Sequence, residues 1–198
     1  MGSGYLVVMS DERWYGDLIP PKFLDATVDQ PVVQRWVDAV LSGETARLLL
    51  LGPSHSGKTH LAYAAVRALL DGGHQVAGVA FHRASDLGRT YEPELIDDGP
   101  PVIVVDDATL SVDINAGVAP QYMGVDPPDI QAMMAVERGR RADAVIRLAM
   151  RADASWIVCA SGVEQLESVL GGGAARAVVE AAEVVVLEKR PFDRVLEW

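Results

Sequence analysis

One stretch of eight residues constrains the fold of this chain more than any other feature. Residues 52–59 read G-P-S-H-S-G-K-T, which fits the phosphate-loop template G-x-x-x-x-G-K-[ST]. The motif follows the apolar run 47–51 and opens a helical pattern over 57–70, which Gly72 and Gly73 close. Because such a loop binds phosphate where a buried strand ends and a helix begins, these residues predict an α/β fold that binds ATP and Mg²⁺.

The residue types in the loop predict their roles. The glycines permit backbone angles that turn successive N–H groups towards phosphate oxygens. Lys58 is expected to reach the β and γ phosphates, and the Thr59 hydroxyl is expected to ligate Mg²⁺. The expected cofactor-binding set is the loop with the residue after it: Gly52, Pro53, Ser54, His55, Ser56, Gly57, Lys58, Thr59 and His60.

Two histidines stand in or beside the loop. His55 occupies a position where many such loops carry a third glycine. It either reports on the nucleotide or on a neighbouring subunit, or it is a solvated loop residue, and we favour the second interpretation. His60 lies just inside the helix, where packing is the simpler expectation.

An acidic pair supplies the second half of the expected site. Asp106 and Asp107 directly follow the apolar run 101–105. A strand buried on both faces would therefore place a carboxylate at the sheet edge beside the loop. Asp106 is the expected second metal ligand, and Asp107 is expected to orient or deprotonate the attacking water. For both residues, the alternative is an ordinary turn residue after a strand.

The rest of the chain alternates between strand and helix patterns. Strands are expected at 47–51, 75–81, 101–105, 156–160 and 183–188, and helices at 31–42, 57–70, 130–151, 164–170 and 174–182. This alternation predicts a three-layer α/β sandwich with a five-stranded, mainly parallel sheet. We expect a single domain over 1–198, with an N-terminal segment at 1–30 and a proline- and glycine-containing insertion loop at 108–128.

Composition narrows the function classes. The net charge of −11 argues against a surface that grips nucleic acid non-specifically. The single cysteine, Cys159, lies in an apolar run, which suits a reducing compartment such as the cytoplasm. No apolar run approaches the roughly 20 residues of a membrane span, and the N-terminus lacks the pattern of a signal peptide.

Several segments together resemble the DnaC/IstB-like branch of AAA+ ATPases, the family of bacterial and phage helicase loaders and transposition helper ATPases. The segments are IPPKFLDA at 19–26, GKTHLAYAAVRALLDGGHQV at 57–76, the double aspartate at 106–107, WIVCASG at 156–162 and LGGGAARAVVEAAEVVVLE at 170–188. The resemblance covers most of the chain except 108–128. It implies an AAA+ type fold without a C-terminal lid domain.

The resemblance also implies roles for residues outside the loop. Ile19, Pro20 and Phe23 would line the base pocket, and Arg176 would be an arginine finger that reaches the nucleotide of a neighbouring subunit. Ser161 stands at the sensor-1 position, where the family usually has asparagine. The expected catalytic residues are therefore Lys58, Asp107, Ser161 and Arg176, acting in a homo-oligomer assembled through the ATP interface.

By this resemblance the chain would hydrolyse ATP, weakly without its oligomer or partner, and would load a replicative helicase. One alternative is an IstB-like transposition helper. A second is a nucleotide-responsive binding module with little turnover, because Asp107 and Ser161 replace stronger catalytic groups. A small-molecule kinase is disfavoured, since no lid follows the core.

Single-stranded DNA is a further candidate partner. A basic strip would come from Arg138, Arg140, Arg141, Arg147 and Arg151. A solvated helix face, with these arginines paired to Glu137, Asp143 and Asp153, explains the pattern equally well.

Overall fold

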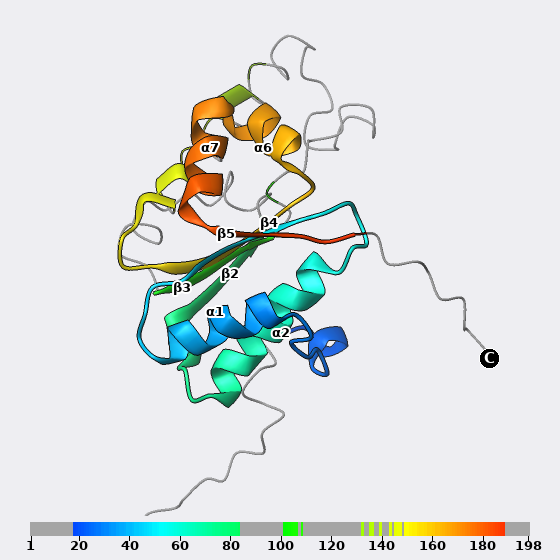
Figure 1. The fold of residues 1–198 in the computed structure, drawn as a ribbon, viewed down its shortest axis with the longest axis vertical. Helices are drawn as coiled ribbons and strands as arrows, with labels where there is room; N and C mark the ends of the chain where they lie inside the picture. The colour runs from blue at the N-terminus through cyan, green and yellow to red at the C-terminus, as the bar shows by residue number, and fades with distance from the viewer. Residues whose placement is uncertain are drawn as a thin grey trace, which may run out of the picture.

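A computed structural model gives the fold of the chain (Figure 1). The residues it describes are 18–83, 101–106, 108 and 151–188, together with single helical positions between 132 and 150, namely 132, 135, 136, 139, 143, 145–147, 149 and 150. Residues 1–17, Asp107 and almost all of the insertion expected at 108–128 lie outside this part of the chain, so those predictions stay untested.

The strands form one parallel sheet in the order β2-β3-β4-β1-β5. They are β1 (Arg47–Leu51), β2 (Val79–Arg83), β3 (Val102–Asp106), β4 (Ser155–Ala160) and β5 (Glu183–Val186). Helices α1 (Pro31–Leu41) and α2 (Lys58–Asp71) cover one face, and α6 (Val163–Leu170) and α7 (Gly172–Ala181) cover the other (Figure 1). The predicted three-layer α/β sandwich is confirmed, with every strand pair parallel.

Strand β1 shows why the apolar runs do not alternate with polar residues. Leu48 and Leu50 pack into the core cluster shared with α1 and α2. Leu49 and Leu51 pack into the cluster shared with α6 and α7. A parallel strand covered on both faces needs apolar side chains at every position, which accounts for the run of four leucines.

The sheet register places three segments at one edge. Leu51 pairs with Ala160 of β4 and with Val186 of β5, so the phosphate loop, Ser161 and Leu187 all follow strand ends that lie side by side. The Gly52 N–H continues the ladder by donating to the Ala160 carbonyl at 3.1 Å. The strand order and register therefore bring the backbone segments of the candidate site together at one edge of the sheet.

Several element boundaries differ from the sequence-based expectations by one to four residues, and the starts of β2 and α7 have a clear local cause. Strand β2 begins at Val79 instead of residue 75, because Val76–Gly78 form a 3-10 turn over which the His74 ring packs. Helix α7 begins at Gly172, so only Gly171, at φ 82°, separates it from α6. Within the described part of the chain, no helix is both long enough and apolar enough to span a membrane.

Candidate nucleotide-binding site

The loop between β1 and α2 turns through left-handed backbone conformations. Gly57, the residue before α2, has φ 96°, and His55 has φ 65°. His55 is the only non-glycine residue with positive φ among those the structure describes. Histidine tolerates this conformation better than most residues, which explains both why glycine is common here and why His55 can replace it. Its side chain is exposed and lines the cleft described below, and both interpretations of its role stay predictions.

Gly52 is required by a close approach of two backbone segments. A Cβ atom on Gly52 would lie 2.5 Å from the Leu187 carbonyl oxygen and 2.7 Å from the Ser56 Oγ. The chain after β5 is held in this position by the Leu187 N–H, which donates to the Leu51 carbonyl at 2.7 Å. Gly52, the first residue of the phosphate loop, therefore packs against Leu187, the residue that follows β5.

Lys58 is almost fully buried in the loop, with 7% of its surface exposed. Its Nζ donates to the carbonyls of Gly52 at 2.7 Å and Pro53 at 2.9 Å. These carbonyls compensate for removing the ammonium group from water. The lysine is therefore held at the N-terminal end of α2, where the helix dipole and free N–H groups favour an anion.

Thr59 and Asp106 meet across the base of the loop. The Thr59 Oγ1 lies 3.1 and 3.0 Å from the two carboxylate oxygens of Asp106, which is 5% exposed at the end of β3. A hydroxyl and a carboxylate are hard oxygen donors of the kind Mg²⁺ accepts beside nucleotide phosphates. The pair fits the predicted metal site, and Asp107 lies outside the described residues.

A cleft of about 460 Å³ joins the loop to two residues distant in sequence. Its lining consists of Phe23, Ser54, His55, Gly57, Lys58, Thr59, His60 and Ser161. Ser161 reaches the cleft because β4 neighbours β1 and ends level with the loop. His60 is exposed and also lines the cleft, so its role in packing or in binding stays a prediction.

Phe23 enters the cleft from a stack of three aromatic rings that sequence reasoning missed. Its ring stacks on Tyr63 at 4.4 Å between centroids, and Tyr63 stacks on Phe81 of β2 at 4.1 Å. His60 meets the Phe23 ring edge-on at 6.3 Å, and the Lys22 Nζ lies 4.8 Å from its centroid. The only sequence signal is that Tyr63 follows Thr59 by one helical turn.

Three of the residues whose roles the resemblance implies do not line the cleft, namely Ile19, Pro20 and Arg176. Ile19 is fully buried in the core cluster with α1 and α2 and is not among the cleft-lining residues. Arg176 is exposed on α7, across the sheet from α2 (Figure 1). Their roles in base and phosphate binding stay predictions.

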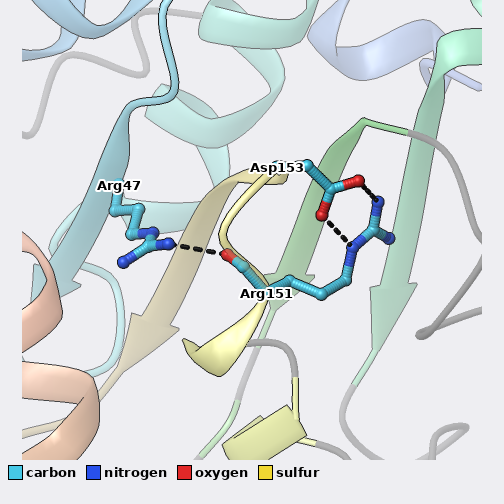
Figure 2. A network of polar contacts seen from close by, with 3 residues as sticks. All are labelled: Arg47, Arg151 and Asp153. Carbon is cyan, nitrogen blue, oxygen red and sulfur yellow. Dashed lines mark hydrogen bonds and ion pairs between the residues drawn. The ribbon is translucent and has the colours of Figure 1, made fainter.

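The described arginines of the expected basic strip are paired with acids. Arg151 Nε and Nη2 each donate to Asp153 at 3.1 Å, and the Arg151 carbonyl accepts from Arg47 Nη2 at 2.6 Å (Figure 2). The hydrogen bond from Arg151 lowers the pKa of Asp153. Arg147 pairs with Asp143 at 3.1 Å. These contacts favour pairing with acids over a phosphate strip at these two positions, although the Arg151 side chain is only 9% exposed and is not solvated as expected. Arg138, Arg140 and Arg141 lie outside the described residues.

The parallel sheet, the loop between β1 and α2, and the carboxylate at the end of β3 define a P-loop nucleoside triphosphatase fold of the AAA+ type. No family model matches the sequence, and no curated protein matches it. Solved structures do share its fold.

Three of these structures are those of the DnaC helicase loader, DnaI and the replication initiator DnaA. The DnaC helicase loader is 19% identical with a TM-score of 0.52, over 84% of this chain and 99% of that chain. DnaI is 16% identical with a TM-score of 0.51, over 87% of this chain and 95% of that chain. The replication initiator DnaA bound to AMPPCP and single-stranded DNA is 17% identical with a TM-score of 0.51, over 87% of this chain and 51% of that chain. The resemblance read from the sequence is thus matched at the level of fold.

Proposed function

We propose that this protein is a Mg²⁺-dependent ATPase that acts as a helicase loader in DNA replication. The observation that carries the proposal is that Lys58 and Thr59 line one cleft and that the Asp106 carboxylate contacts the Thr59 hydroxyl. Lys58 and Thr59 begin α2 and Asp106 ends β3, so the packed helix and strand hold the three side chains in place.

Each residue of the cleft has a distinct task in this proposal. The loop N–H groups and Lys58 bind the β and γ phosphates, while Phe23 packs against the base. Thr59 and Asp106 hold Mg²⁺, which supplies charge neutralisation on the phosphate oxygens when it is bound. Ser161 follows β4 beside β1 and lines the cleft, and it is proposed to hydrogen-bond the attacking water. Asp107 is proposed to orient that water.

Arg176 is proposed to act between subunits. It is exposed on the helical layer opposite α2 and does not line the cleft of its own chain. An arginine supplied by a neighbour stabilises charge on the transferred phosphoryl group and can raise the rate by roughly 10³-fold or more. Hydrolysis would then depend on assembly, as expected for a homo-oligomer.

The named fold neighbours motivate the choice of a loader. The DnaC helicase loader and the replication initiator DnaA share the fold with TM-scores of 0.52 and 0.51. The likeness to the DnaC helicase loader supports a replicative helicase as the proposed partner.

ATPase rate measured against protein concentration tests the enzymatic part. We expect the rate per subunit to rise with concentration, Lys58→Ala to abolish it, and Arg176→Ala to lower it at least tenfold with ATP binding intact. Glu180→Ala is the matched control, since Glu180 is equally exposed one turn further along α7. A rate independent of concentration and unchanged by Arg176→Ala would contradict the proposal.

Affinity capture with Lys58→Ala tests the partner. This variant keeps the fold but cannot turn over nucleotide, so partner complexes accumulate. Recovery of a replicative helicase would support the loader function. Recovery of a transposase instead would overturn it in favour of the transposition helper.

A further inference from the structure

Lys22 extends over an aromatic ring that lines the cleft. Its Nζ stands over the Phe23 ring, 4.8 Å from the centroid. Lys22 is exposed, and no acidic side chain in the described part of the chain forms an ion pair with it. An ammonium group in this position is attracted by the negative charge of the aromatic face. The contact therefore places a cation over one face of Phe23.

The other face of the Phe23 ring is already filled. Tyr63 stacks on Phe23 with 4.4 Å between the ring centroids and 19° between the ring planes. At this spacing no ammonium group fits between the two rings, so Lys22 stands on the opposite face. His60 meets the Phe23 ring edge-on, at 6.3 Å and 70°. Lys22 thus covers the second face of the ring, which Tyr63 and His60 leave open.

Packing behind Phe23 holds the first face in place. Tyr63 is 7% exposed, belongs to the core cluster of α1 and α2, and has the Phe81 ring stacked on its far side at 4.1 Å. The face of Phe23 that Tyr63 covers is therefore closed to a ligand. Any flat ring that stacks on Phe23 takes the face over which Lys22 stands.

The proposed function packs the base of ATP against Phe23, and the present inference rests on that proposal. We propose that Lys22 is a specificity-determining residue whose ammonium group competes with the base for the same face of Phe23. Stacking of a base on an aromatic ring is stronger than an exposed cation–π contact, so the base displaces the lysine at a cost in affinity. A ligand without a base leaves the contact intact. The contact therefore sets a threshold, because only a ring that stacks on Phe23 more strongly than Lys22 does adds to the affinity.

One ratio isolates the competition: the affinity for ATP divided by the affinity for inorganic triphosphate, both measured with Mg²⁺ by calorimetric titration. Loss of the Lys22 charge weakens the attraction for the phosphates of both ligands, so this effect cancels in the ratio. Loss of the competing contact changes only the affinity for ATP. Lys22→Ala should therefore raise the ratio about 2- to 5-fold above that of wild type.

Lys22→Arg tests the same contact in the opposite direction. It keeps the positive charge, and a planar guanidinium group stacks on an aromatic face better than an ammonium group does. We expect the ratio to fall below that of wild type. Arg35→Ala is the matched control, because Arg35 is an exposed cation of α1 that pairs with Glu183 and does not line the cleft. This control should leave the ratio unchanged.

The outcomes separate this inference from the proposed function. If wild type does not bind Mg²⁺–ATP, the proposed function is overturned, and the inference with it. If wild type binds Mg²⁺–ATP and the ratio of Lys22→Ala is unchanged or lower, the inference alone is overturned, because the lysine then does not compete with the base. A ratio in Lys22→Arg as high as that of Lys22→Ala also overturns the inference alone.

Discussion

The Thr59 hydroxyl lies within 3.1 Å of both carboxylate oxygens of Asp106, although 47 residues separate them in the sequence. Thr59 stands in the first turn of α2 and Asp106 is the last residue of β3. Because both elements are buried in the same core cluster, the donor pair is fixed by packing and not by the loop itself. The two oxygen donors are therefore preorganised for a metal ion.

Asp106→Asn should still bind ATP but should lose most of the increase in ATP affinity that Mg²⁺ provides. The amide keeps the shape of the side chain and can still bond Thr59, but it removes the negative charge that a divalent cation requires. We expect wild type to bind ATP at least tenfold more tightly with Mg²⁺ than without, and the variant to lose most of this difference. Calorimetric titration with and without Mg²⁺ measures it. Asp71→Asn, at an exposed position, is the control, and an unchanged Mg²⁺ effect in Asp106→Asn would rule out the metal role.

Gly52→Ala should destabilise the protein even without nucleotide. The new Cβ would stand 2.5 Å from the Leu187 carbonyl, and backbone cannot yield as a flexible side chain does. Overpacking of this kind typically costs about 1–3 kcal/mol. Gly172→Ala is the control, since nothing lies within 4 Å of its Cβ position and it begins a helix. In urea unfolding, Gly52→Ala should have a lower midpoint than wild type, and Gly172→Ala should not. Equal midpoints for the two variants would contradict the packing argument.

Phe23→Leu should weaken binding of the base and not of the phosphates. The variant keeps an apolar side chain but removes the ring that stacks on Tyr63 at the cleft. Aromatic stacking contributes about 0.5–1.5 kcal/mol, so ATP affinity should fall roughly 2- to 12-fold while inorganic triphosphate binds as before. Phe81→Leu removes the other end of the stack outside the cleft and should affect stability more than ATP affinity. Equal losses for ATP and triphosphate would exclude a base-stacking role for Phe23.

The sequence predicted the parts of the fold in which local pattern and tertiary environment agree. The expected range 47–51 coincides with β1, because the run of leucines serves a strand covered on both faces. The start of α2 followed from the loop motif, since the phosphate cradle needs a helix N-terminus there. The meeting of Thr59 with Asp106 was predictable for the same reason: parallel strands end at one edge of the sheet.

Other features depend on contacts that no local pattern encodes. The stack of Phe23, Tyr63 and Phe81 unites a 3-10 turn, a helix and an edge strand, and nothing in the sequence pairs these segments. The close approach of Leu187 to Gly52 follows from β5 lying beside β1, which is a property of the strand order. The sequence left Arg151 either on a basic strip or on a face paired with acids that include Asp153, and spacing alone does not decide between the two. Its pairing with Asp153 comes from the turn that leads into β4.

That turn leads to a prediction about pH. The Arg151 side chain holds the pKa of Asp153 below its ordinary value of 3.8, so the ionised carboxylate is favoured in the folded state. A lowered pKa contributes stability that is present above the unfolded value and is lost as pH falls through the folded value. Asp153→Asn should therefore lower the urea midpoint slightly at pH 7 and pH 5, with the difference from wild type shrinking below about pH 3.8. Because Asp153 is exposed, the effect should also weaken in high salt.

A double-mutant cycle assigns this effect to the pair shown in Figure 2. In an Arg151→Gln background, Asp153→Asn should change the urea midpoint very little at any pH, because the partner that favours the carboxylate is gone. Arg151 also positions its own carbonyl to accept from Arg47 at 2.6 Å, and this backbone contact survives both substitutions. The fold should therefore be intact in all four proteins, as near-ultraviolet circular dichroism would verify. If Asp153→Asn lowers the urea midpoint by the same amount without Arg151, another group in the turn lowers the pKa of Asp153.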